Sequence, residues 1–257
     1  MKRLLVILIT LLVLCGCSKK PVEVEKTETD DNQTVELVEP AKNLIAEEKR
    51  AEYKALWNDN HNINGDYIGQ VFFESGLLNQ PVVQAADNDY YLRRNFATLA
   101  YDEYGTVFED SYCDLDSQNI IMYGHYVYSY YHPQADELMF TPLKFLKQEE
   151  NYEANKTVYL LLEDELREYE VVAVYYCDLY QDGGYWYPNQ NLIYYYTEYD
   201  QTYFEKYKYA IGDAQFYDTG KEYSVNDRFL TLQTCVENRE DLREIVLCKQ
   251  VDTYYYE

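Results

Sequence analysis

At 257 residues, the chain has room for one domain of about 200 residues together with extensions. Its 46 acidic residues outnumber 22 basic ones, and the formal net charge of −24 excludes nucleic acid as a partner, because phosphate neutralisation needs a basic face. Anionic lipid headgroups also repel so acidic a protein, so attachment to a membrane requires a covalent or inserted anchor.

The N-terminus supplies such an anchor. Lys2 and Arg3 precede an apolar stretch of 11 residues, Leu4 to Leu14, which is shorter than the roughly 20 residues of a membrane span and typical of an export signal. The sequence Leu14-Cys15-Gly16-Cys17-Ser18 resembles a bacterial lipoprotein box, in which Cys17 is the lipidated residue. An uncleaved signal anchor is the alternative. In both cases residues 1–17 predict an exported protein held at the extracytoplasmic face of the cell membrane.

Residues 18–42 are polar, strongly acidic and without a periodic apolar pattern. This composition predicts a disordered tether between the anchor and a folded domain at residues 43–257. A helix is expected from about Ala41 to Trp57, where Ile45, Tyr53 and Leu56 share one side.

Strand-like segments dominate the chain from Tyr67 onward. They are rich in β-branched and aromatic residues and are separated by turn-forming residues such as Gly76. Two helical patterns interrupt them, at residues 140–146 and 197–216. Many short strands without an alternating βαβ order predict a mainly β fold, an antiparallel barrel with helical insertions. The expected strands are 67–73, 81–83, 106–108, 119–123, 157–162, 169–176, 229–234 and 244–251.

Six cysteines are present, two of them in the N-terminal signal. Apart from Cys235, the remaining three are Cys113, Cys177 and Cys248, an odd number, and they are expected to be buried free thiols. A Cys177–Cys248 disulfide is the alternative, since both lie in strand-like segments. No Cys or His spacing fits zinc, and neither a metal nor a cofactor is expected. The acidic run Glu163-Asp164-Glu165 suits calcium, but a solvated turn is the simpler interpretation.

A single cysteine closes one of the predicted strands near the C-terminus. Leu230, Leu232 and Thr234 alternate with polar residues, so this strand has a buried face, and Cys235 falls at its end, where side chains reach solvent. Residues 238–241 are expected to form a turn, after which Arg243 opens the returning strand. Two neighbouring strands therefore present Cys235 and Arg243 close together.

With a histidine, this pair has the chemistry of a thiol acyl-transferase. A free thiol has a pKa of roughly 8.5, so a cationic neighbour is needed to favour the thiolate at neutral pH. Arg243 supplies such a charge and can hydrogen-bond a developing oxyanion. His125, which follows the apolar segment 119–123, can act as general acid and then as base. From pattern alone each residue also has an ordinary interpretation, as a packed thiol, a surface histidine or a solvated arginine.

Three motifs resemble those of one enzyme family. Thr231-Leu232-Gln233-Thr234-Cys235 resembles the TLxTC signature of sortases. The segment Asn119-Ile120-Ile121-Met122-Tyr123-Gly124-His125 resembles their histidine strand, and Arg243-Glu244-Ile245-Val246-Leu247 resembles their arginine strand. Further segments resemble class B sortases in particular, and the likeness runs in one order through residues 45–251. These segments are Pro81–Gln84 with Asp87–Leu92, then Tyr104–Phe108, and the helix before the cysteine strand.

The resemblance implies a closed eight-stranded barrel with an N-terminal helix and a helical insertion before the cysteine strand. It also implies a cysteine transpeptidase of a Gram-positive envelope. Such an enzyme cleaves a threonine-containing, C-terminal sorting motif in exported proteins and transfers the acyl group to an amine of a peptidoglycan precursor or a pilin.

By position, the resemblance makes Cys235 the nucleophile, His125 the general acid and base, and Arg243 the group that stabilises the oxyanion and the substrate. Arg239 is a second candidate for the arginine role. Thr234 is a candidate for the oxyanion site, through its backbone N–H or its hydroxyl.

Two features depart from the family pattern. Gln233 stands where class B sortases usually carry Ser, and His125 is followed by a loop that is unusually aromatic. Half-buried packing is the ordinary interpretation of these tyrosines, and peptide binding is the alternative. Two other functions stay open from sequence: a thiol hydrolase of the same fold, and a non-catalytic binding lipoprotein that keeps the barrel. The loop tyrosines are Tyr126, Tyr128, Tyr130 and Tyr131.

Overall fold

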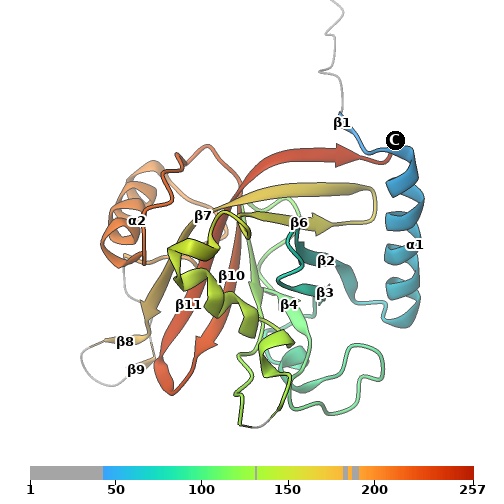
Figure 1. Ribbon diagram of the computed structural model, residues 1–257, viewed down its shortest axis with the longest axis horizontal. Helices are drawn as coiled ribbons and strands as arrows, with labels where there is room; N and C mark the ends of the chain where they lie inside the picture. Colours follow the sequence, from blue (N-terminus) through green and yellow to red (C-terminus); the bar gives the residue numbers. More distant parts are fainter. Residues whose placement is uncertain (1–42, 131, 182–184, 187–190) are drawn as a thin grey trace, which may run out of the picture. The chain divides into compact units, whose positions relative to one another are not determined.

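A closed barrel forms the centre of the molecule (Figure 1). The computed structural model describes residues 43–257 except 131, 182–184 and 187–190, so the predicted signal and tether at 1–17 and 18–42 lie outside the described residues. The barrel strands follow the order β11-β10-β5-β4-β3-β2-β6-β7, and β7 pairs with β11 to close the ring. Their bounds are β2 (Tyr67–Phe73), β3 (Asn79–Val83), β4 (Val107–Glu109), β5 (Asn119–Tyr123), β6 (Thr157–Leu161), β7 (Glu165–Asp178), β10 (Phe229–Val236) and β11 (Arg239–Tyr255).

The predicted closed, mainly β barrel is confirmed, but its expected antiparallel pairing fails at two places. The pairs β3–β4 and β5–β10 are parallel, whereas the other barrel pairs are antiparallel. Parallel neighbours need a long crossover connection, and the chain supplies one in residues 84–106 and another in residues 124–228. Both crossovers begin or pass beside the end of the barrel that carries Cys235, so the parallel pairs matter for the site described below.

Two short pairings lie outside the ring. The two-residue strand β1 (Asn43–Leu44) adds in parallel to the end of β11, at Tyr254 and Tyr255. The strands β8 (Tyr180–Gln181) and β9 (Tyr185–Trp186) form a separate antiparallel ribbon.

The N-terminal helix α1 spans Glu47–Ile63, later than the predicted 41–57. Residues 43 and 44 are extended because they pair with β11, so the helix begins only after Ala46. Its far end continues past Trp57, whose ring stacks on His61 with centroids 4.6 Å apart. The start of the helix was therefore decided by a partner more than 200 residues away in sequence.

The helical insertion before the cysteine strand is α2 (Gln201–Ala214), inside the predicted 197–216. Asp200 caps it, because its side chain accepts a hydrogen bond from the backbone N–H of Tyr203 at 3.0 Å. Short 3-10 helices occupy the connections, and the helix predicted at 140–146 is one of them. They are η1 (Tyr90–Arg93), η2 (Ala135–Glu137), η3 (Thr141–Lys147) and η4 (Glu149–Asn151).

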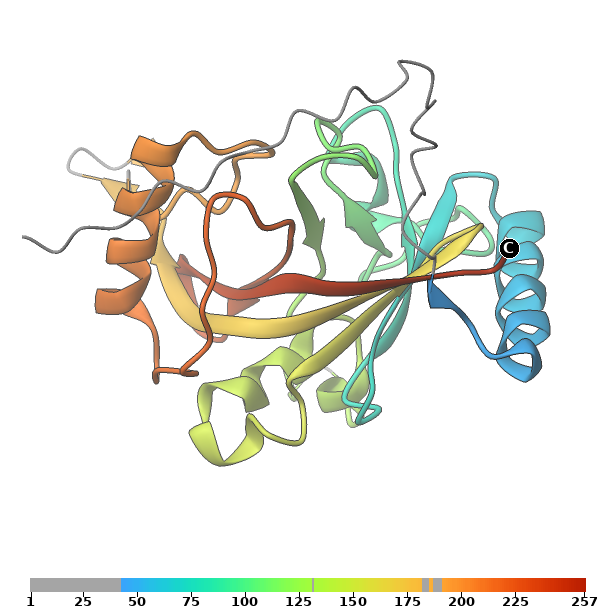
Figure 2. The same ribbon diagram turned by 90° about the horizontal axis from the view of Figure 1, so that it is seen from above.

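Apolar side chains pack in two layers on either side of the sheet. Successive residues of β11 alternate between them: Val246 and Cys248 face the barrel interior, whereas Ile245 and Leu247 pack outside it with α2. Seen from above, α1 and α2 lie at opposite ends of the barrel (Figure 2). Cys177 packs in the outer layer and Cys248 in the inner one, so the two do not form the alternative disulfide; both side chains are buried, as is that of Cys113.

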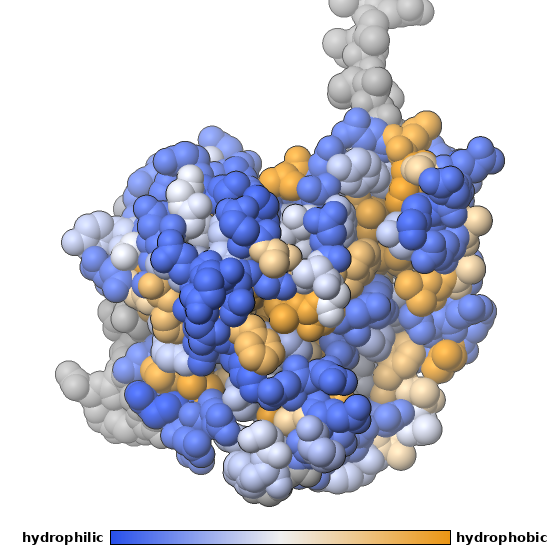
Figure 3. Space-filling view, viewed as in Figure 1, coloured by the Kyte–Doolittle hydropathy of each residue, from blue (hydrophilic) through white to orange (hydrophobic). Residues whose placement is uncertain are grey.

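The face seen in Figure 3 is largely hydrophilic, with apolar patches beside α1 and also nearer the centre of the face. Leu44, Leu56 and Ile63 are among the exposed apolar side chains of the α1 region. Over the described part of the chain, no helix combines the length and the apolar character needed to cross a bilayer.

Candidate active site

Cys235 lies near the end of β10 and directly opposite Arg243 of β11 in the antiparallel register. Opposed residues of such a pair point to the same face, with Cβ atoms about 4.5–5.5 Å apart. A bulge follows Cys235, and only Glu237 and Asn238 form the turn, with Asn238 at φ 58°. The turn is thus shorter than the predicted 238–241, but the predicted meeting of Cys235 and Arg243 is confirmed.

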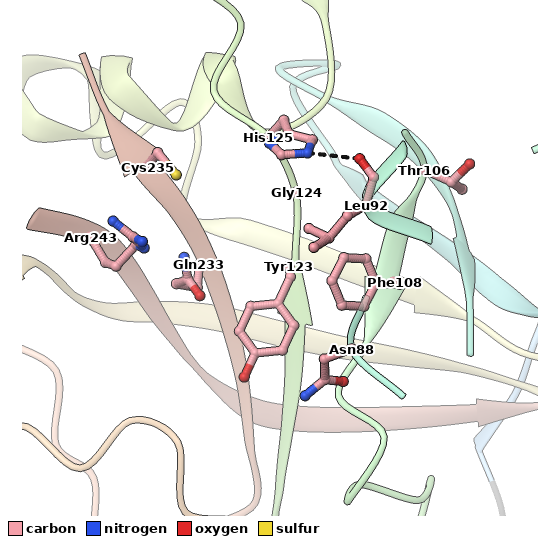
Figure 4. Close-up of a pocket in the computed structure, with 10 residues that line it drawn as sticks. All are labelled: Asn88, Leu92, Thr106, Phe108, Tyr123, Gly124, His125, Gln233, Cys235 and Arg243. Carbon is pink, nitrogen blue, oxygen red and sulfur yellow. Dashed lines mark hydrogen bonds between the residues drawn. The ribbon is translucent and has the colours of Figure 1, made fainter. Parts of the chain in front are cut away.

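His125 reaches the same place through a parallel neighbour. Strand β5 pairs with β10 so that Tyr123 lies opposite Gln233, and the backbone N–H of Gly124 donates to the Gln233 carbonyl at 3.2 Å. The residue after Gly124 therefore emerges beside the end of β10 that carries Cys235. Both side chains line one cleft, and Arg243 lines it with them (Figure 4).

The orientation of His125 is fixed by a backbone carbonyl. Its Nε2–H donates to the carbonyl of Leu92 at 2.9 Å, so Nδ1 is the unprotonated nitrogen of the neutral ring. In Figure 4 the imidazole lies between this carbonyl and the strand of Cys235. Burial lowers the pKa of His125 below its usual 6.5; the Leu92 hydrogen bond opposes this, and the nearby Arg93 charge adds to the lowering. The imidazole is therefore neutral at neutral pH and available as a base.

The cleft has a volume of about 230 Å³ and a polar wall that holds its shape. Asp110 accepts hydrogen bonds from the Tyr123 hydroxyl at 2.7 Å and from the Asn88 amide at 2.9 Å. Burial and this carboxylate raise the pKa of Tyr123, so its hydroxyl stays protonated and continues to donate. Apolar groups, including Leu92 and Phe108, complete the cleft. An extended peptide with a few polar groups suits such a lining.

Known proteins resemble both the sequence and the fold. No protein-family model matches the chain. Sortase B of Listeria monocytogenes, a curated relative, is 27% identical over 221 residues, covering 82% of this chain and 77% of that protein. The solved structure of Clostridium perfringens sortase B is 30% identical, with a TM-score of 0.62, and covers 76% of this chain and 99% of that one. A mutant form of the same enzyme gives a TM-score of 0.65 at 28% identity, over 80% and 90% of the two chains. The chain belongs to the class B sortases.

This membership makes the protein a cysteine transpeptidase with the eight-stranded sortase barrel, as the sequence motifs implied. The alternative of a non-catalytic binding lipoprotein is therefore set aside. At 20% identity, a Staphylococcus aureus sortase B–substrate complex shares the fold, with a TM-score of 0.62 over 80% of this chain and 94% of that one.

The two candidate arginines of this sortase differ in their surroundings. Arg239 is exposed and binds Asp241 through two hydrogen bonds, of 2.8 and 2.6 Å. Arg243 lines the cleft, and its guanidinium donates to the backbone carbonyls of Glu240 and Leu242 at 3.2 and 2.8 Å. These carbonyls orient the planar group beside Cys235. The geometry thus favours Arg243 over Arg239 for contact with a reacting acyl group.

Thr234 points away from Cys235. Its side chain is fully buried on the opposite face of β10, and within the described residues its hydroxyl has no hydrogen-bond partner. Its hydroxyl therefore cannot reach an oxyanion beside Cys235, and only its backbone N–H remains for the role predicted from sequence. Gln233, where the family usually has Ser, lines the cleft itself.

The sequence did not reveal the residues that support Cys235, His125 and Arg243. Leu92 and Arg93 lie in the connection between β3 and β4, and both contact His125. From sequence, the segment Asp87–Leu92 shows only a resemblance to class B sortases. The supporting role of Asp110 could not be predicted from sequence, because a lone acidic residue after a strand is typical of an ordinary turn. Across the described residues, no group of three His, Cys, Asp or Glu side chains is placed to hold a metal, and this includes the acidic turn at Glu163–Glu165.

Proposed function

We propose that this sortase cleaves a threonine-containing sorting motif in exported proteins and joins the new acyl end to an amine of the cell envelope. The observation that carries the proposal is the convergence of Cys235, His125 and Arg243 on one cleft. Two solved relatives support a two-substrate reaction: a Staphylococcus aureus sortase B–substrate complex, and a sortase B complexed with triglycine.

In the proposed first half-reaction, the Cys235 thiol gives its proton to Nδ1 of His125 and attacks the threonine carbonyl carbon. The oxyanion that forms is stabilised by the Arg243 guanidinium. His125, now protonated, donates the proton to the departing amine as the C–N bond breaks. A thioester on Cys235 and a free amine product remain.

In the second half-reaction an acceptor amine attacks the thioester. The new amide bond forms as the C–S bond breaks, and the proton released from the nitrogen passes to neutral His125. If water takes the place of the amine, the same intermediate gives a carboxylic acid, which is the hydrolase alternative.

Intact-mass analysis tests the proposal. The full-length protein in detergent would be incubated with a peptide library of threonine-containing motifs, beside a Cys235→Ala variant. We expect a thioester adduct on the wild type alone, and its mass identifies the motif. An adduct that persists on Cys235→Ala would contradict the proposal. In a second experiment, an amine is added to the wild-type thioester, and the product is an amide if transfer occurs and a carboxylic acid if hydrolysis occurs.

We also propose that Cys17 is lipidated and holds the enzyme at the extracytoplasmic face of the membrane, with residues 18–42 as its tether. The support is the order of three features at the N-terminus. Two positive residues come first, an apolar stretch follows, and the sequence Leu14-Cys15-Gly16-Cys17-Ser18 ends it. Metabolic labelling with a palmitate analogue in a bacterial host tests it. Cys17→Ala should lose the label, whereas Cys15→Ala should keep it; equal labelling of the two variants would contradict the lipoprotein interpretation.

A further inference from the structure

His125 contacts a cation that has no role in the proposed transfer so far. The Nη1 atom of Arg93 lies 3.3 Å from Nε2 of the imidazole, and Nε2 also contacts the Leu92 carbonyl. Because Nε2 donates its proton to this carbonyl, it has no lone pair that could accept an N–H of Arg93. The contact therefore joins two donors, and it becomes a contact between two positive charges whenever Nδ1 of His125 takes up a proton.

The barrel, and not His125, holds Arg93 in place. Its guanidinium donates to the backbone carbonyl of Glu103. Arg93 is also the last residue of η1, which is fixed through Tyr91. The Tyr91 side chain is 1% exposed, its hydroxyl donates to Asp66 at 2.7 Å, and its carbonyl accepts from the backbone N–H of Thr106 at 3.1 Å. The positive charge therefore stays beside the imidazole when His125 gains or loses a proton.

Other titratable or charged side chains line the clefts around His125. They are Tyr101, Glu103 and Tyr104 of the β3–β4 connection, Tyr123 of β5, Tyr126 and Tyr128 of the following loop, Cys235 of β10 and Arg243 of β11. Burial lowers the pKa of His125, the hydrogen bond to Leu92 opposes this, and the Arg93 charge adds to the lowering. Among these described groups, Arg93 is thus the one whose charge changes the acidity of His125.

We propose that Arg93 is a positioning residue for proton transfer: its fixed guanidinium makes the His125 imidazolium a stronger acid and so directs the proton taken from Cys235 to the departing amine. This role rests on the proposed function, in which His125 first accepts and then donates that proton. The amine nitrogen takes the proton from Nδ1 as the C–N bond breaks, and His125 returns to the neutral ring. Arg93 keeps its own protons throughout, because a guanidinium is not deprotonated in proteins.

The same charge extends activity toward acidic pH. Below its pKa, His125 is already an imidazolium before the reaction begins, so it cannot accept the proton of Cys235. A cation beside the ring disfavours this charged form and keeps more of the enzyme in the neutral, active form at mildly acidic pH. Without the Arg93 charge, activity should therefore be lost at a higher pH.

NMR titration of the histidine rings tests the proposal directly. The full-length protein in detergent would carry ¹³C-labelled histidine. The chain has three histidines, so His61→Gln and His132→Gln variants assign the signal of His125. Arg93 is exposed, and solvent screens part of its charge. We therefore expect a modest increase, of about 0.5 on the pH scale, in the titration midpoint of His125 when Arg93→Gln replaces the wild type.

A neighbouring arginine provides the matched control. The Arg94 guanidinium lies 4.3 Å from the Tyr90 ring centroid and donates to the Leu99 carbonyl at 3.1 Å. Arg94→Gln removes the same charge one residue further on, and it should move the midpoint by less than about 0.2 on the pH scale. Arg93→Lys keeps a positive charge and should lie between Arg93→Gln and the wild type. Equal midpoints in the two Gln variants would overturn the proposal.

The rate of thioester formation tests the consequence for catalysis. Measured with a motif peptide and relative to each protein's own rate at pH 7.5, the rate at pH 5.5 should be about two- to threefold lower in Arg93→Gln than in Arg94→Gln. An ester analogue with oxygen in place of the scissile nitrogen depends less on a proton donor, because an alcohol leaves more readily than an amine. Arg93→Gln should therefore slow cleavage of the amide more than that of the ester, by about twofold.

The two measurements separate this role from the proposed function. If no peptide forms a thioester, the proposed function fails, while the NMR midpoint still decides whether Arg93 sets the acidity of His125. If thioesters form and the amide-to-ester ratio of rates is the same in Arg93→Gln and Arg94→Gln, Arg93 does not direct the proton, and the proposal alone fails.

Discussion

Gly124 occupies a position that no larger residue fits. A Cβ atom built there would lie 2.5 Å from Cγ of Phe140, whose ring is fully buried. The neighbouring backbone is tied on both sides, since Gly124 donates to the Gln233 carbonyl and Phe140 donates to the His125 carbonyl at 3.1 Å. The absence of a side chain at one residue thus lets the histidine lie beside the cysteine strand.

Replacing Gly124 by Ala should therefore affect stability and catalysis together. We expect a loss of about 1–3 kcal/mol of unfolding free energy from overpacking against Phe140. Because His125 is displaced, thioester formation should slow by an order of magnitude, roughly 10-fold or more. Gly212→Ala in α2 is the matched control: nothing lies within 4 Å of the new Cβ, and the variant should gain about 0.5–1 kcal/mol. Urea unfolding and single-turnover kinetics check both, and a wild-type rate in Gly124→Ala would contradict the account.

The two arginines near Cys235 allow a paired test of oxyanion stabilisation. Arg243→Lys keeps the charge but loses the planar fork, so we expect thioester formation to fall by about 10²-fold. Arg239→Lys alters an exposed pair with Asp241 and should change the rate by less than about threefold. The rate of thioester formation is the measurement, and the reverse order of effects would assign the role to Arg239.

Among the elements, β11 connects more of the molecule than any other described strand. It has 17 residues and pairs with β10, β7 and β1. Glu244 alternates with Val246 and Cys248 on the face of β11 that points into the barrel, lies opposite Thr234 and is 1% exposed. Among described groups neither carboxylate oxygen has a hydrogen-bond partner, and the Lys147 ammonium is 4.0 Å away. Burial accordingly raises the pKa of Glu244 to about 7, although Lys147 and Lys144 oppose the shift.

Glu244 should make the barrel less stable as the pH rises. The folded state keeps the proton up to about pH 7, while the unfolded chain releases it near 4.5, so the stabilisation is complete below 4.5 and is lost as pH rises through 7. Glu244→Gln removes this dependence. It should match the wild type near pH 4 and exceed it at pH 8 by on the order of 2–3 kcal/mol.

Urea unfolding at several pH values measures the difference between Glu244→Gln and the wild type. Glu163→Gln, at an exposed position before β7, is the matched control and should show no pH-dependent difference. A constant difference between Glu244→Gln and the wild type from pH 4 to 8 would show that Glu244 does not titrate in the folded state as described. Glu109 on β4, whose pKa burial raises to about 8, contributes with the same sign.

On the scale of the whole molecule, a closed ring of strands carries a large negative charge. The formal net charge is −24, and closure leaves the eight barrel strands without a free edge through most of their length. Self-repulsion of the acidic side chains destabilises the compact state, but a closed barrel with two packed apolar layers resists it.

Salt should therefore stabilise the protein at neutral pH. Raising the ionic strength from 0.01 to 0.15 M shortens the screening length from about 30 to about 8 Å, so repulsion between surface carboxylates weakens. A gain of roughly 1 kcal/mol corresponds to an increase in Tm of about 2–4 °C for a domain of this size. Thermal unfolding in NaCl, with sucrose of equal osmolality as the control, checks this. A Tm that does not rise with salt would mean that net repulsion is unimportant.

The amino-acid sequence determined the features that depend on local pattern. The bounds of β2 and β5 were predicted to the residue, because their runs of apolar and aromatic side chains are sharply bounded by turn formers. The meeting of Cys235 and Arg243 followed from one short turn and the alternation of a strand pair. The family, the barrel and the enzyme class followed from three motifs in order.

Only the tertiary structure decided what depends on partners distant in sequence. The start of α1 was set by the pairing of Asn43 and Leu44 with the end of β11, and the two parallel pairs were set by crossovers that no periodicity reveals. The Leu92 carbonyl that orients His125 and the burial of Glu244 arise in the same way. Periodicity shows which face of a segment is apolar, but it does not show which segment covers that face, and closure of the ring decides that.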